Sequence, residues 1–429
     1  MILTFRRRLR PHDPGVTGRA TFDGRIDSHC SRDGTKRRDS VLLRDDKMVL
    51  KVANVITSFN SASGGPPRTV ALMAHAGLGF WEAQLFTTNA IAATADSMLT
   101  NDFPGRVTIL PARAQTAFRS LLMFSGLTPV HEAQLLSGVA PDVMHIHGIW
   151  SLFLSAFAAT AIRHRIPYIV TPHGMLEPWS MSVHSWRKLA ALRTYQGQLL
   201  AHAAAIHATS HTEAENLRRL RWIRSPIVVI PNSVDDPTGL IDAARNIPER
   251  KVLLFLSRIH EKKGLDLLLK AWNQARPRDW TLFIVGSGEQ TYVDRLKRFC
   301  RTESVPHVEF YGHVDGDARE DMFRQASALV LPTYSENFGN VIAEALIRGL
   351  PVLTTTGTPW SIVADQGMGW YFRPDIEELR RVLAELEVTG PTALRAMGAR
   401  GRKYAVANLS NSVVRGQLLE MYRNVAGSQ

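Results

Sequence analysis

Short apolar runs alternate with helical stretches from residue 48 almost to the end of the chain. This alternation is typical of α/β proteins, in which parallel strands are buried on both faces. The first series of predicted strands lies at 52–58, 83–88, 106–111, 142–147, 168–172, 204–209 and 227–231. The second series lies at 252–257, 280–286, 308–312, 328–332 and 351–355. The pattern predicts two doubly wound sheets, each with a crevice for ligands at the carboxyl ends of its strands.

A polar stretch at 232–250 separates the two series of strands. It contains two prolines and no apolar run, so we interpret it as an interdomain linker. The sequence therefore predicts a first domain at 48–231 and a second domain at 251–408. A final helix is expected within 409–429.

The first 47 residues differ from the rest of the chain. Residues 1–47 have no apolar periodicity, so we expect a disordered extension. They also lack the apolar stretch of a secretory signal. Because Met48 opens a strongly apolar strand, we hypothesise that translation starts there.

Length, cysteine content and charge limit the number of domains and the cellular compartment but do not identify a binding partner. The length of 429 residues favours two domains, and the two cysteines, Cys30 and Cys300, cannot form a disulfide framework, which fits a reducing cytosol. The longest apolar run, 149–162, is too short to span a membrane and is expected to be a buried helix. The net charge of +12 could suit nucleic acid, anionic lipid or a phosphorylated substrate, and charge alone does not choose between them.

Candidate chemistry appears where strands end in the second half. The loop SRIHEKKG, 257–264, places Arg258 and Lys263 beside a crevice, where two cations would suit a diphosphate; the alternative is a pair of solvated loop cations. In VGSGEQ, Gly286 and Gly288 permit close backbone approach, but the third glycine of a dinucleotide fingerprint is missing.

The stretch SENFGNVIAEA, 335–345, is more specific. A helix is expected to start at Gly339-Asn340, so the amides of Phe338, Gly339 and Asn340 would form an anion site at its positive end. Glu336 would precede this site and Glu344 would follow it by roughly 7.5 Å along the helix. Carboxylates on both sides of a bound anion would suit a nucleoside diphosphate sugar, with Glu336 at the sugar hydroxyls and Glu344 at the ribose. In the alternative, Glu336 only balances the helix dipole and Glu344 is a surface residue.

These motifs together resemble the retaining glycosyltransferase family 4, which has the GT-B fold. The resemblance rests on SRxxxxKG, the paired glycines, the two glutamates eight residues apart and IPNSVD at 230–235, and it spans about residues 50–425. TPHGM at 171–175 and TPW at 358–360 further resemble bacterial enzymes that build exopolysaccharide or lipopolysaccharide. The resemblance implies two Rossmann-like domains facing a cleft, with the first domain on the acceptor side, and a final helix that crosses back to the first domain.

The resemblance also assigns roles to residues. It implies that Arg258 and Lys263 bind the donor diphosphate, Glu336 orients the donor sugar and Glu344 holds the ribose, with the amides of 338–340 assisting. Gly64 and Gly65 match the family's glycine loop near donor and acceptor, and His173 matches a histidine that contacts the transferred sugar. His145 and His147 also end a strand, and either could simply pack.

The expected reaction is transfer of a sugar, with retention, from a UDP- or GDP-sugar to a glycan or polyprenyl-linked acceptor in bacterial surface polysaccharide synthesis. No cofactor and no metal are expected: Asp315 and Asp317 spell a D-x-D pair, but Asp317 is more simply a helix N-cap. An epimerase of similar two-domain shape and a non-catalytic carbohydrate-binding protein remain alternatives. A dinucleotide oxidoreductase lacks its fingerprint.

Partners and location are expected to follow from that reaction. We expect a cytoplasmic protein and no nucleic-acid partner. The segment 175–205 mixes Trp, Leu, Lys and Arg on a predicted helix, which would either contact the inner face of an anionic membrane or pack as a core helix.

Overall fold

The computed structural model describes residues 49–59, 65–88, 107–110, 127, 129–136, 140–182, 185–236 and 250–427. Residues 1–47 lie outside the described residues, together with the disorder predicted for them, and so do Gly64 and most of the expected linker.

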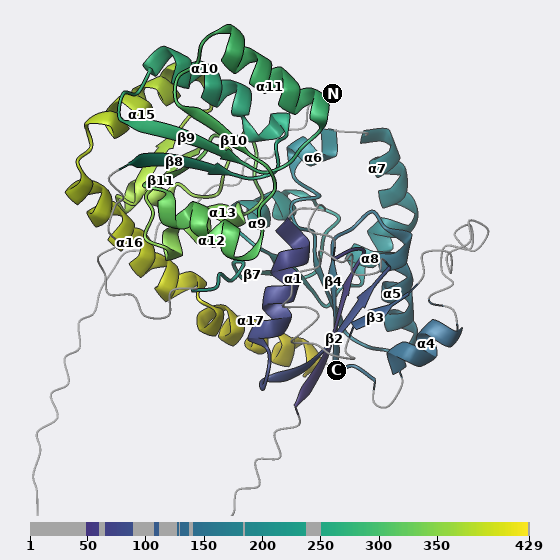
Figure 1. Ribbon diagram of the computed structural model, residues 1–429. Coiled ribbons are helices and arrows are strands. Elements are labelled where there is room, and N and C mark those ends of the chain that lie inside the picture. The colour runs from purple at the N-terminus through teal and green to yellow at the C-terminus, as the bar shows by residue number, and fades with distance from the viewer. Residues whose placement is uncertain are drawn as a thin grey trace, which may run out of the picture. The chain divides into compact units, whose positions relative to one another are not determined.

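The first domain contains a seven-stranded parallel sheet in the order β3-β2-β1-β4-β5-β6-β7 (Figure 1). Its strands are β1 (Leu50–Ile56), β2 (Trp81–Thr87), β3 (Val107–Ile109), β4 (Val143–His147), β5 (Tyr168–Thr171), β6 (Ala205–Ala208) and β7 (Ile227–Val229). Its longer helices are α1 (Gly65–Ala76), α4 (Pro129–Leu136), α5 (Leu152–Arg163) and α9 (His211–Arg219). The strand order reverses between β1 and β4, which places a ligand crevice at that point of the sheet.

The second domain repeats this topology with a six-stranded parallel sheet in the order β10-β9-β8-β11-β12-β13. Its strands are β8 (Lys251–Leu256), β9 (Trp280–Val285), β10 (Val308–Tyr311), β11 (Ala328–Leu331), β12 (Val352–Thr355) and β13 (Gly369–Phe372). Its helices are α10 (Leu265–Ala275), α11 (Gln290–Thr302), α12 (Gly316–Gln325), α13 (Asn340–Ile347), α14 (Ile362–Asp365), α15 (Ile376–Val388) and α16 (Pro391–Leu409). The prediction of two doubly wound α/β domains is confirmed, and β13 is a strand that the sequence pattern missed.

The segment 175–205 differs from the single helix that we expected. It is broken into α6 (Pro178–Ser182), α7 (Ser185–Ala191), a five-residue π-helix (Leu192–Gln196) and α8 (Gly197–Ala201). A π-helical turn shifts the register of the side chains, so the segment does not keep one continuous apolar face. The apolar run at 149–162, by contrast, forms α5 as predicted and packs its phenylalanines into the core.

The last helix, α17 (Asn411–Ala426), lies beside α1 of the first domain (Figure 1). Leu418, Met421 and Tyr422 belong to the same buried apolar cluster as β1 and β2. The rings of Tyr422 and Trp81 pack edge to face, with 5.3 Å between their centroids. The end of the chain therefore supplies part of the core of the first domain.

Candidate functional site

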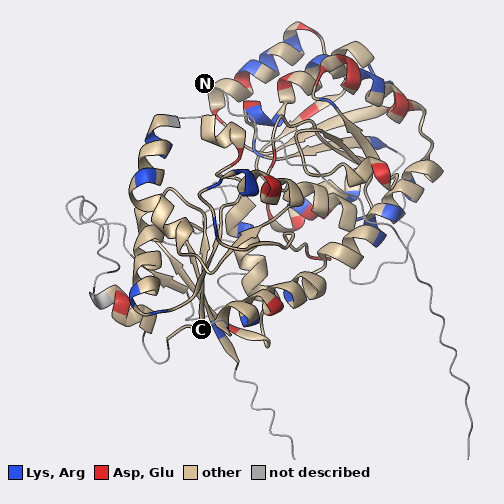
Figure 2. Cartoon of the chain, turned by 180° about the vertical axis from the view of Figure 1, so that it is seen from behind, with Lys and Arg blue, Asp and Glu red and all other residues tan. Residues whose placement is uncertain are grey.

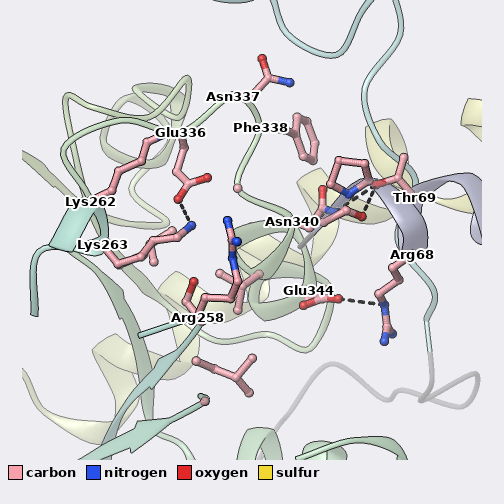
Figure 3. Close-up of a pocket in the computed structure, with 18 of the residues that line it drawn as sticks. Arg68, Thr69, Arg258, Lys262, Lys263, Glu336, Asn337, Phe338, Asn340 and Glu344 are labelled. Atoms are coloured by element: carbon pink, nitrogen blue, oxygen red, sulfur yellow. Dashed lines mark hydrogen bonds and ion pairs between the residues drawn. The ribbon is translucent and has the colours of Figure 1, made fainter. Parts of the chain in front are cut away.

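One cavity of about 870 Å³ lies between the two domains, at the carboxyl ends of their strands (Figure 3). Every site residue predicted from the sequence that the structure describes lines this cavity. They are Gly65, His173, Arg258, Lys263, Gly286, Gly288, Glu336, Phe338, Gly339, Asn340 and Glu344. Gly64 lies outside the described residues.

The loop after β8 supplies several of the cations that line the cavity. Arg258 is exposed to the cavity and forms no hydrogen bond or ion pair with any described residue. Lys263 ends a 3₁₀ turn (Glu261–Lys263), and its ammonium group pairs with the carboxylate of Glu336. Gly264 follows with a φ of +72°, and a Cβ there would lie 2.1 Å from the carbonyl oxygen of Pro332, so only glycine fits this turn.

A third cation, Lys262, was not singled out from the sequence. Its ammonium group lies 4.4 Å from the centre of the Trp179 ring, which belongs to α6 of the first domain. Burial lowers the pKa of Lys262, Glu336 and Glu177 raise it, and the neighbouring cations Lys263 and Arg258 lower it, with a net downward shift. A third positive charge therefore reaches across the cavity toward the first domain.

Helix α13 begins at the cavity as the sequence predicted. Gly339 is its N-cap with a φ of +81°, and Asn340 is its first residue. No described residue accepts a hydrogen bond from the amides of Phe338, Gly339 or Asn340. These donors at the positive end of the helix are therefore available to an anion.

Glu344 is buried, with only 5% of its surface exposed, so the alternative of a surface residue is wrong. Its carboxylate pairs with Arg319 of α12 and lies 3.4 Å from Nε of Arg68 on α1 (Figure 3). Burial alone would raise the pKa of Glu344, but Arg319, Arg68 and Arg348 outweigh it and hold the pKa below its usual range. The carboxylate stays ionised and retains lone pairs for ribose hydroxyls.

The paired glycines have a structural reason that the sequence did not reveal. A Cβ on Gly286 would lie 2.0 Å from the carbonyl oxygen of Ser257, and one on Gly288 would lie 1.9 Å from that of Ile259. Ile259 also donates its amide proton to the carbonyl of Ser287, at 2.8 Å. The glycines thus let the loop after β9 pack directly on the loop that carries Arg258.

His173 lies in a tight turn after β5, with a left-handed φ of +52°. Its Nε2 atom is 3.4 Å from Nδ1 of His147. Burial and, to a smaller extent, the nearby His207 lower the pKa of His173 to about 3, so its ring is neutral at physiological pH. A neutral ring can accept or donate a hydrogen bond toward the cavity.

The other histidines of this cluster are fully buried and hydrogen-bonded within the protein. His145 contacts Tyr422 at 2.9 Å and Thr171 at 2.7 Å, and His207 donates to the carbonyl oxygen of Ile230 at 2.8 Å. His145 therefore packs inside the first domain, whereas His147 reaches the cavity only through His173.

The site joins the two domains through two asparagines near the start of α13. The side-chain amide of Asn340 donates to Thr69 Oγ1 at 3.1 Å, and its oxygen accepts from Asn232 at 2.7 Å. Asn337 donates to Thr209 Oγ1 at 2.8 Å. The sequence motif indicated a role only for the backbone amide of Asn340. Its side-chain contacts join distant segments of the chain and therefore leave no local sequence pattern.

The D-x-D pair does not behave as expected. Asp315, and not Asp317, is the N-cap of α12, and Asp317 lies in the first turn. Asp315 instead contacts His313 at 2.6 Å. Among the residues that the structure describes, no group of three or more potential ligands could hold a metal ion.

The structure has two Rossmann-like domains that face each other, with a helix end suited to an anion in the cleft between them. This arrangement defines a class of proteins that bind nucleotides between their domains. Comparison with known proteins identifies the family. Residues 250–387 match the family described as glycosyl transferases group 1, and residues 64–233 match the glycosyl transferase 4-like domain. The chain is 30% identical over 309 residues to a D-inositol 3-phosphate glycosyltransferase of Nocardiopsis dassonvillei, covering 65% of this chain and 70% of that protein. The chain therefore belongs to the group 1 glycosyltransferase family.

Further relatives agree with this family. A phosphatidyl-myo-inositol mannosyltransferase of Mycobacterium tuberculosis is 28% identical over 299 residues, covering 67% of this chain and 75% of that protein. An uncharacterized glycosyltransferase of Methanocaldococcus jannaschii is 25% identical over 238 residues, covering 50% of this chain and 57% of that protein. The crystal structure of Anabaena HepE in complex with UDP and glucose superimposes with a TM-score of 0.68 at 18% identity, covering 87% of this chain and all of that one, which shows the same fold.

Proposed function

We propose that the protein transfers a hexosyl group, with retention of anomeric configuration, from a UDP- or GDP-sugar to a glycan or lipid-linked acceptor in bacterial surface polysaccharide synthesis. The observation that carries this proposal is the single cavity in which Arg258, Lys263 and the free amides at the start of α13 come together. Such a set of donors fits a diphosphate better than any neutral ligand. Membership of the family favours glycosyl transfer over the epimerase and the non-catalytic alternatives.

In the proposed reaction, the bond between the anomeric carbon and the diphosphate oxygen breaks, and its electron pair leaves with the diphosphate. Arg258, Lys263 and the α13 amides stabilise that charge as it develops in the transition state. The acceptor hydroxyl attacks from the side of the leaving group, forms the new bond to the anomeric carbon and passes its proton to a diphosphate oxygen. No protein nucleophile is required.

The remaining predicted residues are proposed to position the donor. Glu336, whose carboxylate is held by Lys263, would accept hydrogen bonds from the sugar hydroxyls. Glu344 would bind the ribose, and His173 would contact the transferred sugar from the first domain. Gly65 would border the donor at the start of α1.

A panel of UDP- and GDP-sugars tests this function. The purified protein should release UDP or GDP from at least one donor, and NMR of the product should show the anomeric configuration of that donor. Inversion would overturn the proposed mechanism, and conversion of one free sugar nucleotide into its epimer would favour the epimerase.

We propose that the reaction needs no metal and no cofactor, because Arg258 and Lys263 already supply positive charge at the diphosphate. Activity should therefore survive incubation with EDTA. Loss of activity in EDTA that added magnesium or manganese restores would reject this proposal.

We also propose that the enzyme works at the inner, cytoplasmic face of an anionic membrane. Among the described residues, no helix is long and apolar enough to span a bilayer. The observation that supports surface contact is on α7, where Trp186 is 68% exposed, Leu189 is 54% exposed and Arg187 lies beside the Trp186 ring. Figure 2 shows the Lys and Arg positions of this helix in blue. Exposed aromatic and basic side chains on one short helix suit an interface with acidic lipid headgroups.

Flotation with phosphatidylglycerol vesicles tests this contact. The protein should float with acidic vesicles and remain in solution with phosphatidylcholine, and Trp186→Ser with Leu189→Ser should abolish flotation. Val388→Ser is the matched control, because Val388 is 83% exposed but lies on α15 of the second domain. Failure of the wild-type protein to float would exclude the membrane contact.

A further inference from the structure

The first domain contributes to the cavity one carboxylate that has no role in the proposed binding of the sugar donor. Glu177 lies between β5 and α6, in the same turn as His173, and lines the cavity. Its amide donates to the carbonyl of Gly174 at 3.1 Å, and its carbonyl accepts from Met181 at 2.8 Å, so the backbone of Glu177 is fixed at both ends. Its side chain is only partly exposed.

The two oxygens of this carboxylate differ in their surroundings. Oε2 accepts a hydrogen bond from the side-chain amide of Asn216 on α9. No described residue donates a hydrogen bond to Oε1. The neighbouring carboxylate of Glu213, in contrast, is fully used: it accepts from the amides of Gly174 and Thr209 and from the Thr209 hydroxyl. Of this carboxylate pair, Glu177 alone has acceptor capacity left for a ligand.

The position of Lys262 places Glu177 opposite the donor sugar. The Lys262 ammonium lies 4.4 Å from the centre of the Trp179 ring, two residues after Glu177 in the first domain, and the neighbouring Lys263 pairs with Glu336 of the second domain. Glu177 and Glu336 line the same cavity from different domains, so Glu177 lies on the first-domain side of the space in which the donor sugar is proposed to bind. This is the side from which an acceptor would approach.

We propose that Glu177 is an acceptor-binding residue, whose Oε1 atom accepts a hydrogen bond from an O–H group of the acceptor other than the one that gives its proton to the diphosphate, and so holds the attacking oxygen against the donor sugar. This inference rests on the proposed glycosyl transfer and adds a contact that positions the incoming acceptor. Asn216 is a positioning residue, because its hydrogen bond to Oε2 leaves Oε1 directed to the ligand.

Protonation would reverse the role of Oε1. Since Oε2 is held by a donor, a proton on the carboxyl group must reside on Oε1, which would then donate rather than accept. Burial and the nearby Glu213 raise the pKa of Glu177 to about 7, while Asn216 and Lys262 oppose that rise. The hydrogen bond to the acceptor is therefore expected to form above about pH 7 and to be lost below it.

The substitution Glu177→Gln imitates the protonated state at every pH. Because Asn216 donates to Oε2, the glutamine oxygen would take that place, and its NH₂ group would point into the cavity as a donor. The conservative variant Glu177→Asp keeps an acceptor and should retain part of the activity.

The test uses water as the smallest acceptor. Release of UDP or GDP from the preferred donor is measured between about pH 5.5 and 8.5, together with the affinity for the nucleoside diphosphate. The wild-type rate should rise with an apparent pKa near 7. Above pH 7, Glu177→Gln should be slower than the wild type by roughly 10- to 100-fold, as expected for a lost hydrogen bond to a charged group. Its rate should also lack the rise with pH, called here the pH limb, that the wild type shows. Its nucleotide affinity should be unchanged.

Glu215→Gln is the matched control, because Glu215 lies on the same helix as Asn216 but is exposed and does not line the cavity. It should behave as the wild type. The proposal is overturned if Glu177→Gln keeps the wild-type rate, if the pH limb persists in it, or if nucleotide affinity falls as much as the rate. If the wild-type protein uses no donor at all, the proposed function itself fails, and this inference fails with it.

Discussion

Replacing Arg258 by alanine should separate function from folding more cleanly than any other change in the cavity. The side chain is exposed and forms no ion pair or hydrogen bond with a described residue, and Figure 3 shows it directed into the space between Glu336 and Glu344. Exposed substitutions without such contacts usually change the free energy of unfolding by less than about 0.5 kcal/mol. We therefore expect Arg258→Ala to melt at nearly the same temperature as the wild type.

The loss in ligand binding should be much larger. A hydrogen bond to a charged group contributes about 1.5–3 kcal/mol, and about 1.4 kcal/mol corresponds to a factor of ten. The dissociation constant for UDP or GDP should thus rise roughly 10- to 150-fold. The turnover number should also fall, because the diphosphate carries more negative charge in the transition state than in the bound donor.

Isothermal titration calorimetry at about 50 mM and about 500 mM salt measures the affinity. The difference between wild type and Arg258→Ala should shrink at high salt, since ions screen the charge of an exposed guanidinium. Arg380→Ala is the control, because Arg380 is an exposed arginine on α15 that pairs only with Glu377 among the described residues. Unchanged nucleotide affinity in Arg258→Ala, or a large drop in its thermal stability, would refute this reasoning.

Three further predictions concern two substitutions in the site and the dependence of stability on pH. Gly286→Ala should lower both stability and nucleotide affinity, because its Cβ would lie 2.0 Å from the Ser257 carbonyl oxygen and displace the cationic loop; thermal unfolding and calorimetry measure both. Burial lowers the pKa of His207 from 6.5 to about 4 although its bond to a backbone carbonyl raises it, so the unfolded chain binds this proton more readily. The contribution of His207 to the free energy of unfolding should consequently fall by on the order of 3 kcal/mol as the pH drops from about 6.5 to about 4. Burial also lowers the pKa values of His145, His147 and His173, so these should add to the fall, which urea titrations at several pH values can measure. Asn340→Ala removes the bonds to Thr69 at 3.1 Å and to Asn232 at 2.7 Å, and should weaken donor binding by at least about 0.5–1.5 kcal/mol with unchanged secondary structure by circular dichroism; unaltered donor affinity would show that these bonds do not support the site.

Most of the fold could be predicted because buried parallel strands leave continuous apolar runs. Twelve predicted strands agree with the structure to within about two residues, as β1 illustrates, predicted at 52–58 and observed at 50–56. The thirteenth, β13, was missed because GWYF is a short edge strand that begins with a glycine, and its first three residues are only partly buried. Its pairing with β12 depends on the rest of the sheet and not on its own pattern.

The site could be predicted only where its residues belong to local motifs. Arg258, Lys263, Glu336 and Glu344 lie in two short segments with recognisable spacing, and the structure brings both segments to one cavity. The partners of Glu344 could not be found in this way, because Arg319 comes from another helix and Arg68 from the other domain. For the same reason, the carboxylate of Glu177 became a candidate only when Asn216 and Lys262 were seen around it.

The start of α13 links donor binding to the association of the two domains. The side chains of Asn337 and Asn340 bond to the first domain, at Thr209 and Thr69. The backbone amides of the same segment have no acceptor among the described residues and face the cavity. A diphosphate on these amides would hold the segment in the conformation that bonds to the first domain, because side chains and amides share one backbone. Donor binding and domain closure should therefore stabilise each other.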